Sequence, residues 1–111
     1  MPRFFDGRLF DFNLGTAGGE SAVPGLAENL EALVAENGAY TAVANGRFKG
    51  GYITRHFGKP QDGIHAVQLE LSQITYMEET RPYKYDETRA GQVAPVIQTL
   101  VQHALDAVRA A

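Results

Sequence analysis

The stretch IHAVQLEL, residues 64–71, is the part of the chain that decides its fold. Its residue types favour a β-strand, in which successive side chains point to opposite faces. Both faces carry apolar side chains: His65, Val67, Leu69 and Leu71 on one, and Ile64, Ala66, Gln68 and Glu70 on the other. A strand of this kind usually lies inside a sheet with layers above and below it. The sequence therefore predicts an interior strand.

Helical patterns flank this strand on both sides. Pro24 is suited to the start of a helix, the pattern Leu26, Leu30, Leu33 and Val34 gives it one apolar face, and Asn37-Gly38 is suited to its end. Further along, Asp86 is a plausible N-cap for a last helix. Pro95 lies inside that helical pattern, so we expect a kink there or a later start. The expected apolar stripe of the last helix comprises Val93, Ile97, Leu100, Val101, Ala104, Leu105 and Val108.

The remaining segments are less regular. Residues 40–43 predict a short strand that ends at the Asn45-Gly46 turn, and the alternative is a hairpin from this turn into residues 48–55. The first 20 residues place four phenylalanines beside glycines without a clean period, which predicts an extended, loop-rich segment. The order helix, strand, strand, helix indicates a layered α/β arrangement.

Length and composition set the limits. A chain of 111 residues is enough for one domain. Two or three strands and two helices are few for a sheet that is covered on both faces, so the chain is expected to be part of a larger domain. Cysteine is absent, which excludes disulfides and thiolate chemistry. The sequence shows no secretion signal and no apolar run of the roughly 20 residues that a membrane span needs. We therefore expect a cytoplasmic protein without a membrane partner.

Positive charge is gathered in one place, NGRFKGGYITRHFGKP, which we call the basic segment (residues 45–60). It contains no acidic residue, whereas the chain without its four lysines and arginines has 6 basic and 13 acidic residues, a balance of −7. Such a segment is either a solvated loop or an anion site, and we favour the site. The acidity of the rest argues against nucleic acid as a partner.

Candidate chemistry falls on few residues. Glu70 sits on an apolar strand, where burial favours a carboxylate that accepts a proton as a general base; the alternative is an ion pair at the strand end. Arg55 can bind a carboxylate with its planar fork, and the neighbouring lysines, Lys49 and Lys59, can neutralise a second one. His56 could donate to an oxyanion. The other candidates are Asn13 and Thr16, which could bind at a site edge or simply form a turn.

A metal site is poorly supported. The three histidines, at positions 56, 65 and 103, have no short ligand spacing. The stretch GTAGGES precedes a helix and could hold an anion, but it matches neither the dinucleotide nor the nucleoside-triphosphate pattern. No metal ligand is assigned within this chain.

Three blocks in order carry a more specific signal: PRFFDGRLFDFNLGT, NGRFKGGYITRHFGKP and GIHAVQLELSQITYM, followed by the tail YDETRAGQVAPVIQTL. Together they resemble the N-formylglutamate amidohydrolases, also called N-formylglutamate deformylases, across essentially the whole chain. The resemblance implies a part of a three-layer α/β/α mixed sheet similar to the zinc carboxypeptidase or phosphorylase-hydrolase-like fold. It covers only the C-terminal part of such a protein, so we expect one domain portion, residues 1–111.

The resemblance also implies an activity, the metal-dependent hydrolysis of N-formylglutamate to formate and glutamate in histidine degradation. It places Glu70 as the general base, and Arg55, His56, Lys49 and Asn13 on the substrate side. A divalent metal, zinc or cobalt, is implied for the full-length family, with ligands upstream of Pro2 and none held by this chain. The isolated chain is then expected to be inactive.

Two alternatives stay open. The chain could be a non-catalytic module that binds a small dicarboxylate through the basic segment. It could also bind nucleic acid through the aromatic and basic residues of that segment, although its overall charge disfavours this. The missing part of the domain would leave apolar surface, which favours self-association.

Overall fold

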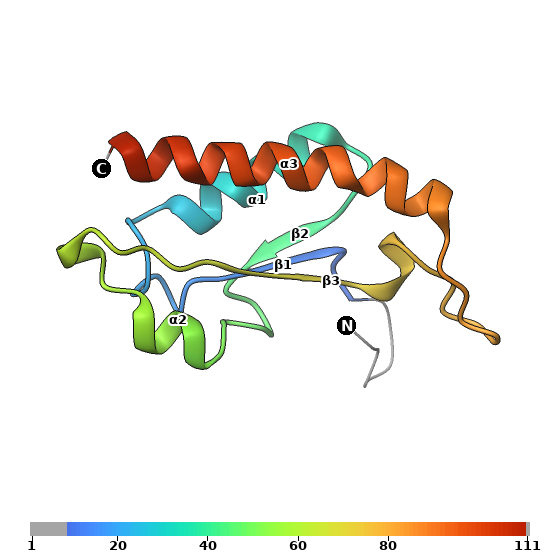
Figure 1. The fold of residues 1–111 in the computed structure, drawn as a ribbon, viewed down its shortest axis with the longest axis horizontal. Coiled ribbons are helices and arrows are strands. Elements are labelled where there is room, and N and C mark those ends of the chain that lie inside the picture. The colour runs from blue at the N-terminus through green and yellow to red at the C-terminus, as the bar shows by residue number, and fades with distance from the viewer. Residues whose placement is uncertain (1–8, 111) are drawn as a thin grey trace.

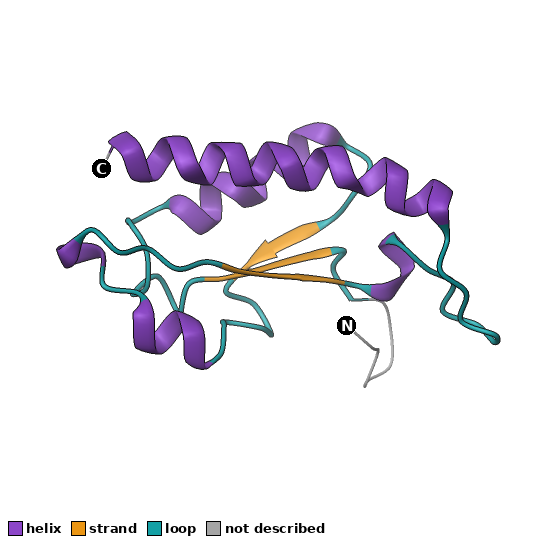
Figure 2. Ribbon diagram, viewed as in Figure 1, coloured by secondary structure: helices purple, strands orange, loops and turns teal. Residues whose placement is uncertain are grey.

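The computed structural model describes residues 9–110, which form a three-stranded sheet with helices on both faces (Figures 1 and 2). Helices α1 (Leu26–Asn37) and α3 (Glu87–Ala110) lie together on one face, and the short helix α2 (Tyr52–Phe57) lies on the other. Two 3-10 turns, Pro60–Asp62 and Gln73–Thr75, flank the third strand. The predicted α/β class is confirmed.

The central strand of the sheet is β1 (Phe12–Gly15), a segment expected to be loop-rich. It pairs in parallel with β2 (Ala42–Ala44) and antiparallel with β3 (Gln68–Leu71). All four residues of β1 are buried. The loop-rich prediction is therefore wrong for this stretch, because its strand partners come from distant segments and leave no local period. The part of that prediction on residues 1–8 lies outside the described residues.

The two strands beside β1 also differ from expectation. Only residues 68–71 of the predicted strand are paired, and β3 lies at an edge of the described sheet, so its interior placement is wrong. The strand β2 begins two residues later than predicted. The hairpin alternative is wrong as well, because β2 pairs in parallel with β1 and part of the following segment is the helix α2.

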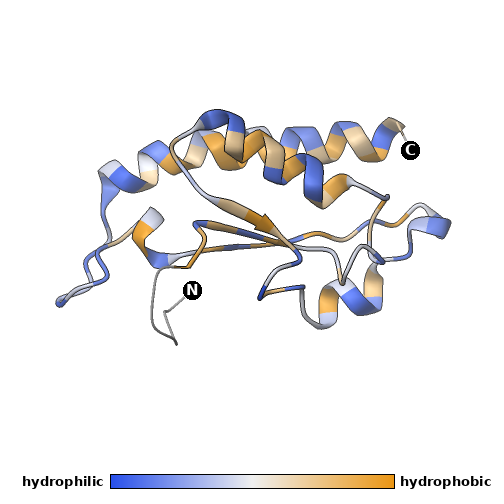
Figure 3. Ribbon diagram, turned by 180° about the vertical axis from the view of Figure 1, so that it is seen from behind, coloured by the Kyte–Doolittle hydropathy of each residue, from blue (hydrophilic) through white to orange (hydrophobic). Residues whose placement is uncertain are grey.

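The core lies between the sheet and the helices α1 and α3. Helix α1 ends as predicted, at Gly38, whose φ of 78° is the left-handed conformation that glycine tolerates best. Hydrophobic and hydrophilic residues alternate along α1 and α3 (Figure 3), as expected of helices with one buried face. The buried cluster consists of Phe12, Leu14, Ala22, Leu26, Leu30, Val34, Val93, Val96 and Leu100.

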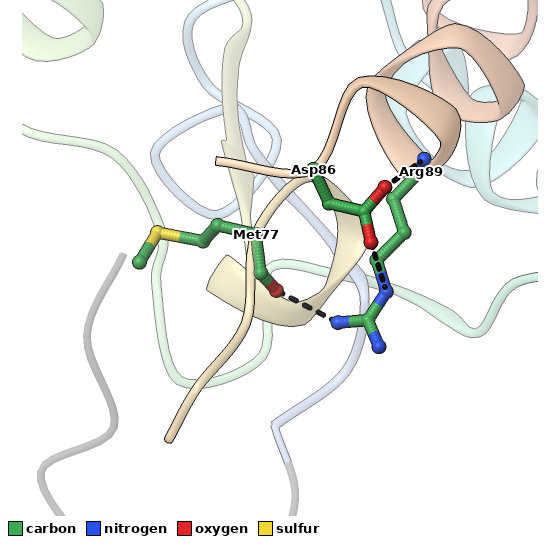
Figure 4. Close-up of polar contacts among 3 residues, drawn as sticks. All are labelled: Met77, Asp86 and Arg89. Carbon is green, nitrogen blue, oxygen red and sulfur yellow. Dashed lines mark hydrogen bonds and ion pairs between the residues drawn. The ribbon is translucent and has the colours of Figure 1, made fainter. Parts of the chain in front are cut away.

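The start of α3 is fixed by its predicted N-cap (Figure 4). Asp86 Oδ1 accepts the backbone N–H of Arg89 at 3.0 Å, and Asp86 Oδ2 lies 3.4 Å from the Arg89 guanidinium. Arg89 also donates to the carbonyl of Met77 at 2.9 Å, which ties the preceding connection to the helix. The helix runs on through Pro95, so the later start that we considered is wrong.

The apolar stripe of α3 is rotated from the predicted one. Val93 and Leu100 are buried as expected, and Val96 joins them. Val101 and Leu105 are 63% and 42% exposed, so their predicted burial is wrong. The sequence offers two overlapping apolar stripes, and the sheet and α1 cover only one of them.

Among residues 9–110, no helix has the length and apolar character needed to cross a membrane.

Candidate functional site

The candidate site lies on the face of the sheet turned away from α1 and α3. Asn13 of β1 stands directly opposite Glu70 of β3, and Gly15 stands opposite Gln68. Residues opposite each other in a sheet share one face, and side chains alternate along a strand. Asn13, Gln68 and Glu70 therefore point away from the core, to the side on which α2 lies (Figure 1).

A short chain of hydrogen bonds joins Glu70 to the beginning of α2. Glu70 Oε1 accepts a hydrogen bond from Gln68 Nε2. Gln68 Oε1 in turn accepts the backbone N–H of Gly51 at 2.9 Å. Glu70 is half-buried, and the hydrogen bond from Gln68 holds one of its carboxylate oxygens.

Glycines and one buried threonine pack together at the start of α2, inside the basic segment. Gly50 has a φ of 103°, and a Cβ at this position would lie 2.3 Å from Thr54 Oγ1. Thr54 is 2% exposed and donates its hydroxyl hydrogen to the carbonyl of Gly51 at 2.8 Å. This packing requires glycine at position 50 and fixes α2 against the loop that precedes it.

The two predicted substrate-binding residues of α2 are exposed. Arg55 and His56 lie in the last turn of the helix. The ring of His56 stacks on Tyr52, with centroids 4.7 Å apart and 15° between planes, and meets Phe57 edge-on at 4.7 Å. Within residues 9–110 no ion pair joins Arg55 or His56 to Glu70. They belong to the helix that lies on the same side of the sheet as Glu70.

Lys49 is brought beside the end of β1 by its backbone. Its carbonyl accepts the N–H of Ala17 at 2.7 Å. A Cβ at Gly15 would lie 2.5 Å from the carbonyl carbon of Lys49, so only glycine allows this approach. The exposed side chain of Lys49 thus begins next to the strand that carries Asn13.

Asn13 and Thr16 have local hydrogen-bond partners. Asn13 is 3% exposed, and its Nδ2 donates to the carbonyl of Phe10 at 2.8 Å. Thr16 Oγ1 accepts from Asn45 Nδ2 at 3.0 Å, and the Thr16 carbonyl accepts the N–H groups of Gly19 and Ser21. The turn-forming alternative for Thr16 is confirmed.

The described residues do not fit a metal ion. His65 Nδ1 accepts the backbone N–H of Val23 at 2.9 Å, a structural role. His103 lies on α3, on the other face of the sheet from α2. In the part of the chain from residue 9 to residue 110, no group of three or more histidine, cysteine, aspartate or glutamate side chains could hold a metal.

Two residues that the structure connects to the sheet, Gln68 and Asp11, were not among the candidates predicted from the sequence. Gln68 stands two positions before Glu70, and the period of a strand was the signal that both point to the same face. Asp11, 2% exposed, accepts the Thr41 N–H at 3.0 Å and the Ser72 hydroxyl at 3.3 Å, 30 and 61 residues away. No local pattern shows such distant partners.

The geometry defines a mixed α/β unit. One face of its sheet is apolar and covered by α1 and α3, and the other face carries Glu70 on the side of α2. A sequence model described as N-formylglutamate amidohydrolase matches residues 1–77. The chain belongs to this family, whose members are hydrolases.

Individual relatives agree. The chain is 56% identical over 102 residues to the N-formylglutamate deformylase of Pseudomonas putida and 52% identical over 105 residues to that of Pseudomonas aeruginosa PAO1. These matches cover 92% and 95% of this chain but 38% and 40% of the relatives. The crystal structure of N-formylglutamate amidohydrolase from Ralstonia eutropha JMP134 superposes with a TM-score of 0.69 at 28% identity, over 95% of this chain and 35% of that one.

Proposed function

We propose that this chain is the substrate-side portion of an enzyme that hydrolyses N-formyl-L-glutamate to formate and glutamate in histidine degradation, in the cytoplasm. The observation that carries the proposal is the shared face of Glu70, Asn13 and the basic helix α2 in a chain 56% identical to an N-formylglutamate deformylase. We also propose that the sheet forms part of a three-layer fold of the zinc carboxypeptidase type.

In this proposal Glu70 is the general base. It accepts a proton from the water that attacks the formyl carbon and passes it to the departing amine of glutamate. The substrate carries two carboxylates, which match the charge of the basic segment. Arg55 binds one of them through its planar fork, Lys49 neutralises the other, and His56 donates to an oxygen of the substrate. Asn13 borders the site beside Glu70.

The complete enzyme is also proposed to use a divalent metal, zinc or cobalt. Residues 9–110 offer no suitable group of ligands, so the ligands would come from the part of the relatives that this chain does not match. The family matches leave about three-fifths of each deformylase uncovered. We accordingly propose that the chain alone hydrolyses little or no substrate and that its exposed apolar surface promotes self-association.

A second candidate is a non-catalytic module for a small dicarboxylate. The exposed side chains of Arg55 and Lys49 favour it, because cations on the surface bind anions without any catalytic group. Binding of glutamate and N-formylglutamate with no turnover in any context would support the module.

The deciding experiment measures formate release from N-formyl-L-glutamate. The chain is assayed alone, with zinc or cobalt and with a chelator, and then together with the unmatched part of the Pseudomonas putida deformylase as a second polypeptide. We expect release only from the mixture. Metal-dependent release by the chain alone would show that it builds its own site and would overturn the proposed division of residues.

The mixture also tests Glu70. Because a general base contributes about 100-fold or more to a rate, Glu70→Gln should lower kcat by at least about 100-fold. Glu87→Gln, at an exposed position in the first turn of α3, is the matched control and should leave kcat unchanged. Equal rates for the two variants would remove Glu70 from the reaction.

A further inference from the structure

Gln68 joins two parts of the candidate site that the sequence keeps apart. Its Nε2 donates to Glu70 Oε1, and its Oε1 accepts the N–H of Gly51, the N-cap residue of α2. We propose that Gln68 is a positioning residue that sets the orientation of the Glu70 carboxylate and the placement of α2 together. This inference rests on the proposed function only in taking Glu70 as the base.

The amide group suits both contacts. A glutamine side chain has a donor end and an acceptor end, and each end of Gln68 has one partner of the opposite kind. Gln68 and Glu70 are two positions apart on β3, so both side chains leave the same face of the strand. No shorter or purely apolar side chain makes both contacts.

The contact at Gly51 controls where α2 begins. The first N–H groups of a helix have no partner within the helix and need an acceptor from elsewhere. A Cβ at Gly51 would meet one atom within 4 Å, Gln68 Oε1 at 3.7 Å. Gln68 Oε1 therefore accepts the Gly51 N–H and also lies closest to the position of a Cβ at Gly51. The Gly51 carbonyl then accepts the backbone N–H of Arg55 at 3.2 Å. Arg55 is the first of the two basic residues in the helix.

The contact at Glu70 restricts the base. Fixing Oε1 by a hydrogen bond limits rotation of the carboxylate and so defines where its second oxygen points. Reactions between held groups slow by large factors when the reacting atoms are misplaced by about 1 Å. The same side chain thus transmits any shift of α2 to the base, which makes binding of the substrate and proton transfer depend on one residue.

Two substitutions separate the two contacts. Gln68→Glu keeps an oxygen to accept the Gly51 N–H but replaces the donor to Glu70 with a second carboxylate. Gln68→Leu removes both contacts at similar volume. Gln98→Leu, at an exposed position on α3, is the control for the loss of an amide that has neither role.

The first readout is hydrogen exchange of the Gly51 amide in the isolated chain, followed by NMR. Loss of one neutral hydrogen bond corresponds to about 3- to 10-fold faster exchange, and we expect this in Gln68→Leu. Gln68→Glu and Gln98→Leu should stay within about twofold of the parent chain.

The second readout is steady-state kinetics of the chain mixed with the unmatched part of the Pseudomonas putida deformylase. Gln68→Glu should lower kcat by about 10-fold with KM nearly unchanged. It should also move the acidic limb of the pH–rate profile to higher pH, because two adjacent carboxylates resist joint ionisation. Gln68→Leu should lower kcat and raise KM. A residue with a merely structural role would not produce this difference.

Unchanged Gly51 exchange in Gln68→Leu would overturn the proposal, as would kinetics of both Gln68 variants that match Gln98→Leu. The exchange experiment needs no turnover. If the mixture with the parent chain released no formate, that result would count against the proposed function, while Gly51 exchange would still decide whether Gln68 holds α2.

Discussion

Asp11 carries a buried carboxylate next to the sheet and forms hydrogen bonds with segments that are distant in the sequence. It accepts hydrogen bonds from Thr41 and Ser72, and its own N–H donates to Thr41 Oγ1 at 2.9 Å. These contacts join the start of β1 to the segments beside β2 and β3. Tyr40 lies next to this carboxylate, and its ring meets Phe12 edge-on at 5.4 Å. Burial, and then the negative charge of Asp11, raise the pKa of the Tyr40 hydroxyl above its ordinary value of 10.0.

The raised pKa of Tyr40 predicts a loss of stability in alkali. The unfolded chain releases this proton near pH 10.0, whereas the folded chain retains it to higher pH. The stabilisation is thus complete below pH 10.0 and is lost as the pH rises through the folded value. Between neutral pH and a pH just above 10.0, the free energy of unfolding measured with urea should fall less in Tyr40→Phe than in the parent chain. Tyr85→Phe, at an exposed position, is the control and should lose as much unfolding free energy as the parent chain. If Tyr85→Phe lost as little as Tyr40→Phe, the effect could not be assigned to Tyr40.

At the scale of elements, the approach of the basic segment to β1 depends on Gly15. Gly15→Ala would place a methyl group 2.5 Å from the carbonyl carbon of Lys49 and 2.6 Å from the nitrogen of Gly50. Since backbone atoms on both sides must move, we expect this substitution to lower the free energy of unfolding by about 1–3 kcal/mol. Gly91→Ala, in α3 with no atom within 4 Å of the added Cβ, should raise it by about 0.5–1 kcal/mol. Equal effects in urea denaturation would show that the close approach is absent in solution.

The elements that local signals specify are those that the sequence predicts well. Helix α1 has an apolar period and a glycine stop, and α3 has an N-cap, so both were found. The strand β1 was missed because Asn13 and Gly15 weaken its pattern, and its burial comes from partners that pair across the chain. Helix α2, six residues between glycines, is too short for a period. The residues of the candidate site were named from their chemistry, but the pairing of Asn13 with Glu70 and the bridge through Gln68 depend on strand register.

The face that α3 buries can be tested with two identical substitutions. Leu100 is 3% exposed in the core, whereas Leu105 is 42% exposed, although both belong to the stripe expected from the sequence. Leu100→Ala should cost about 2–5 kcal/mol of unfolding free energy because it removes buried methyl groups and leaves a cavity. Leu105→Ala should change it by no more than about 0.5 kcal/mol. Similar values in urea denaturation of the isolated chain would show that α3 is rotated from its described position.

At the scale of the whole molecule, several large apolar side chains of the described residues are exposed. Tyr52, Ile53 and Phe57 are 62%, 68% and 53% exposed on one short helix. The deformylases that it matches continue well beyond the matched part. Contiguous apolar surface of this kind usually marks a contact with protein. In the isolated chain, a second copy is the available partner, and the clustered residues of α2 make that helix the expected contact.

Sedimentation velocity tests this expectation. The sedimentation coefficient of the parent chain should rise with concentration, and Ile53→Ser should weaken the rise because it removes a large side chain from the α2 cluster. Val101→Ser, at a position of similar exposure (63% against 68%) on α3, should leave the rise intact. Lys49, Arg55 and Lys59 are exposed in the same segment of the chain, so like charges oppose a contact between two copies. Added salt should therefore strengthen association by screening these charges. A single sedimentation coefficient at all concentrations, or equal effects of the two serine variants, would show that α2 is not a contact between copies.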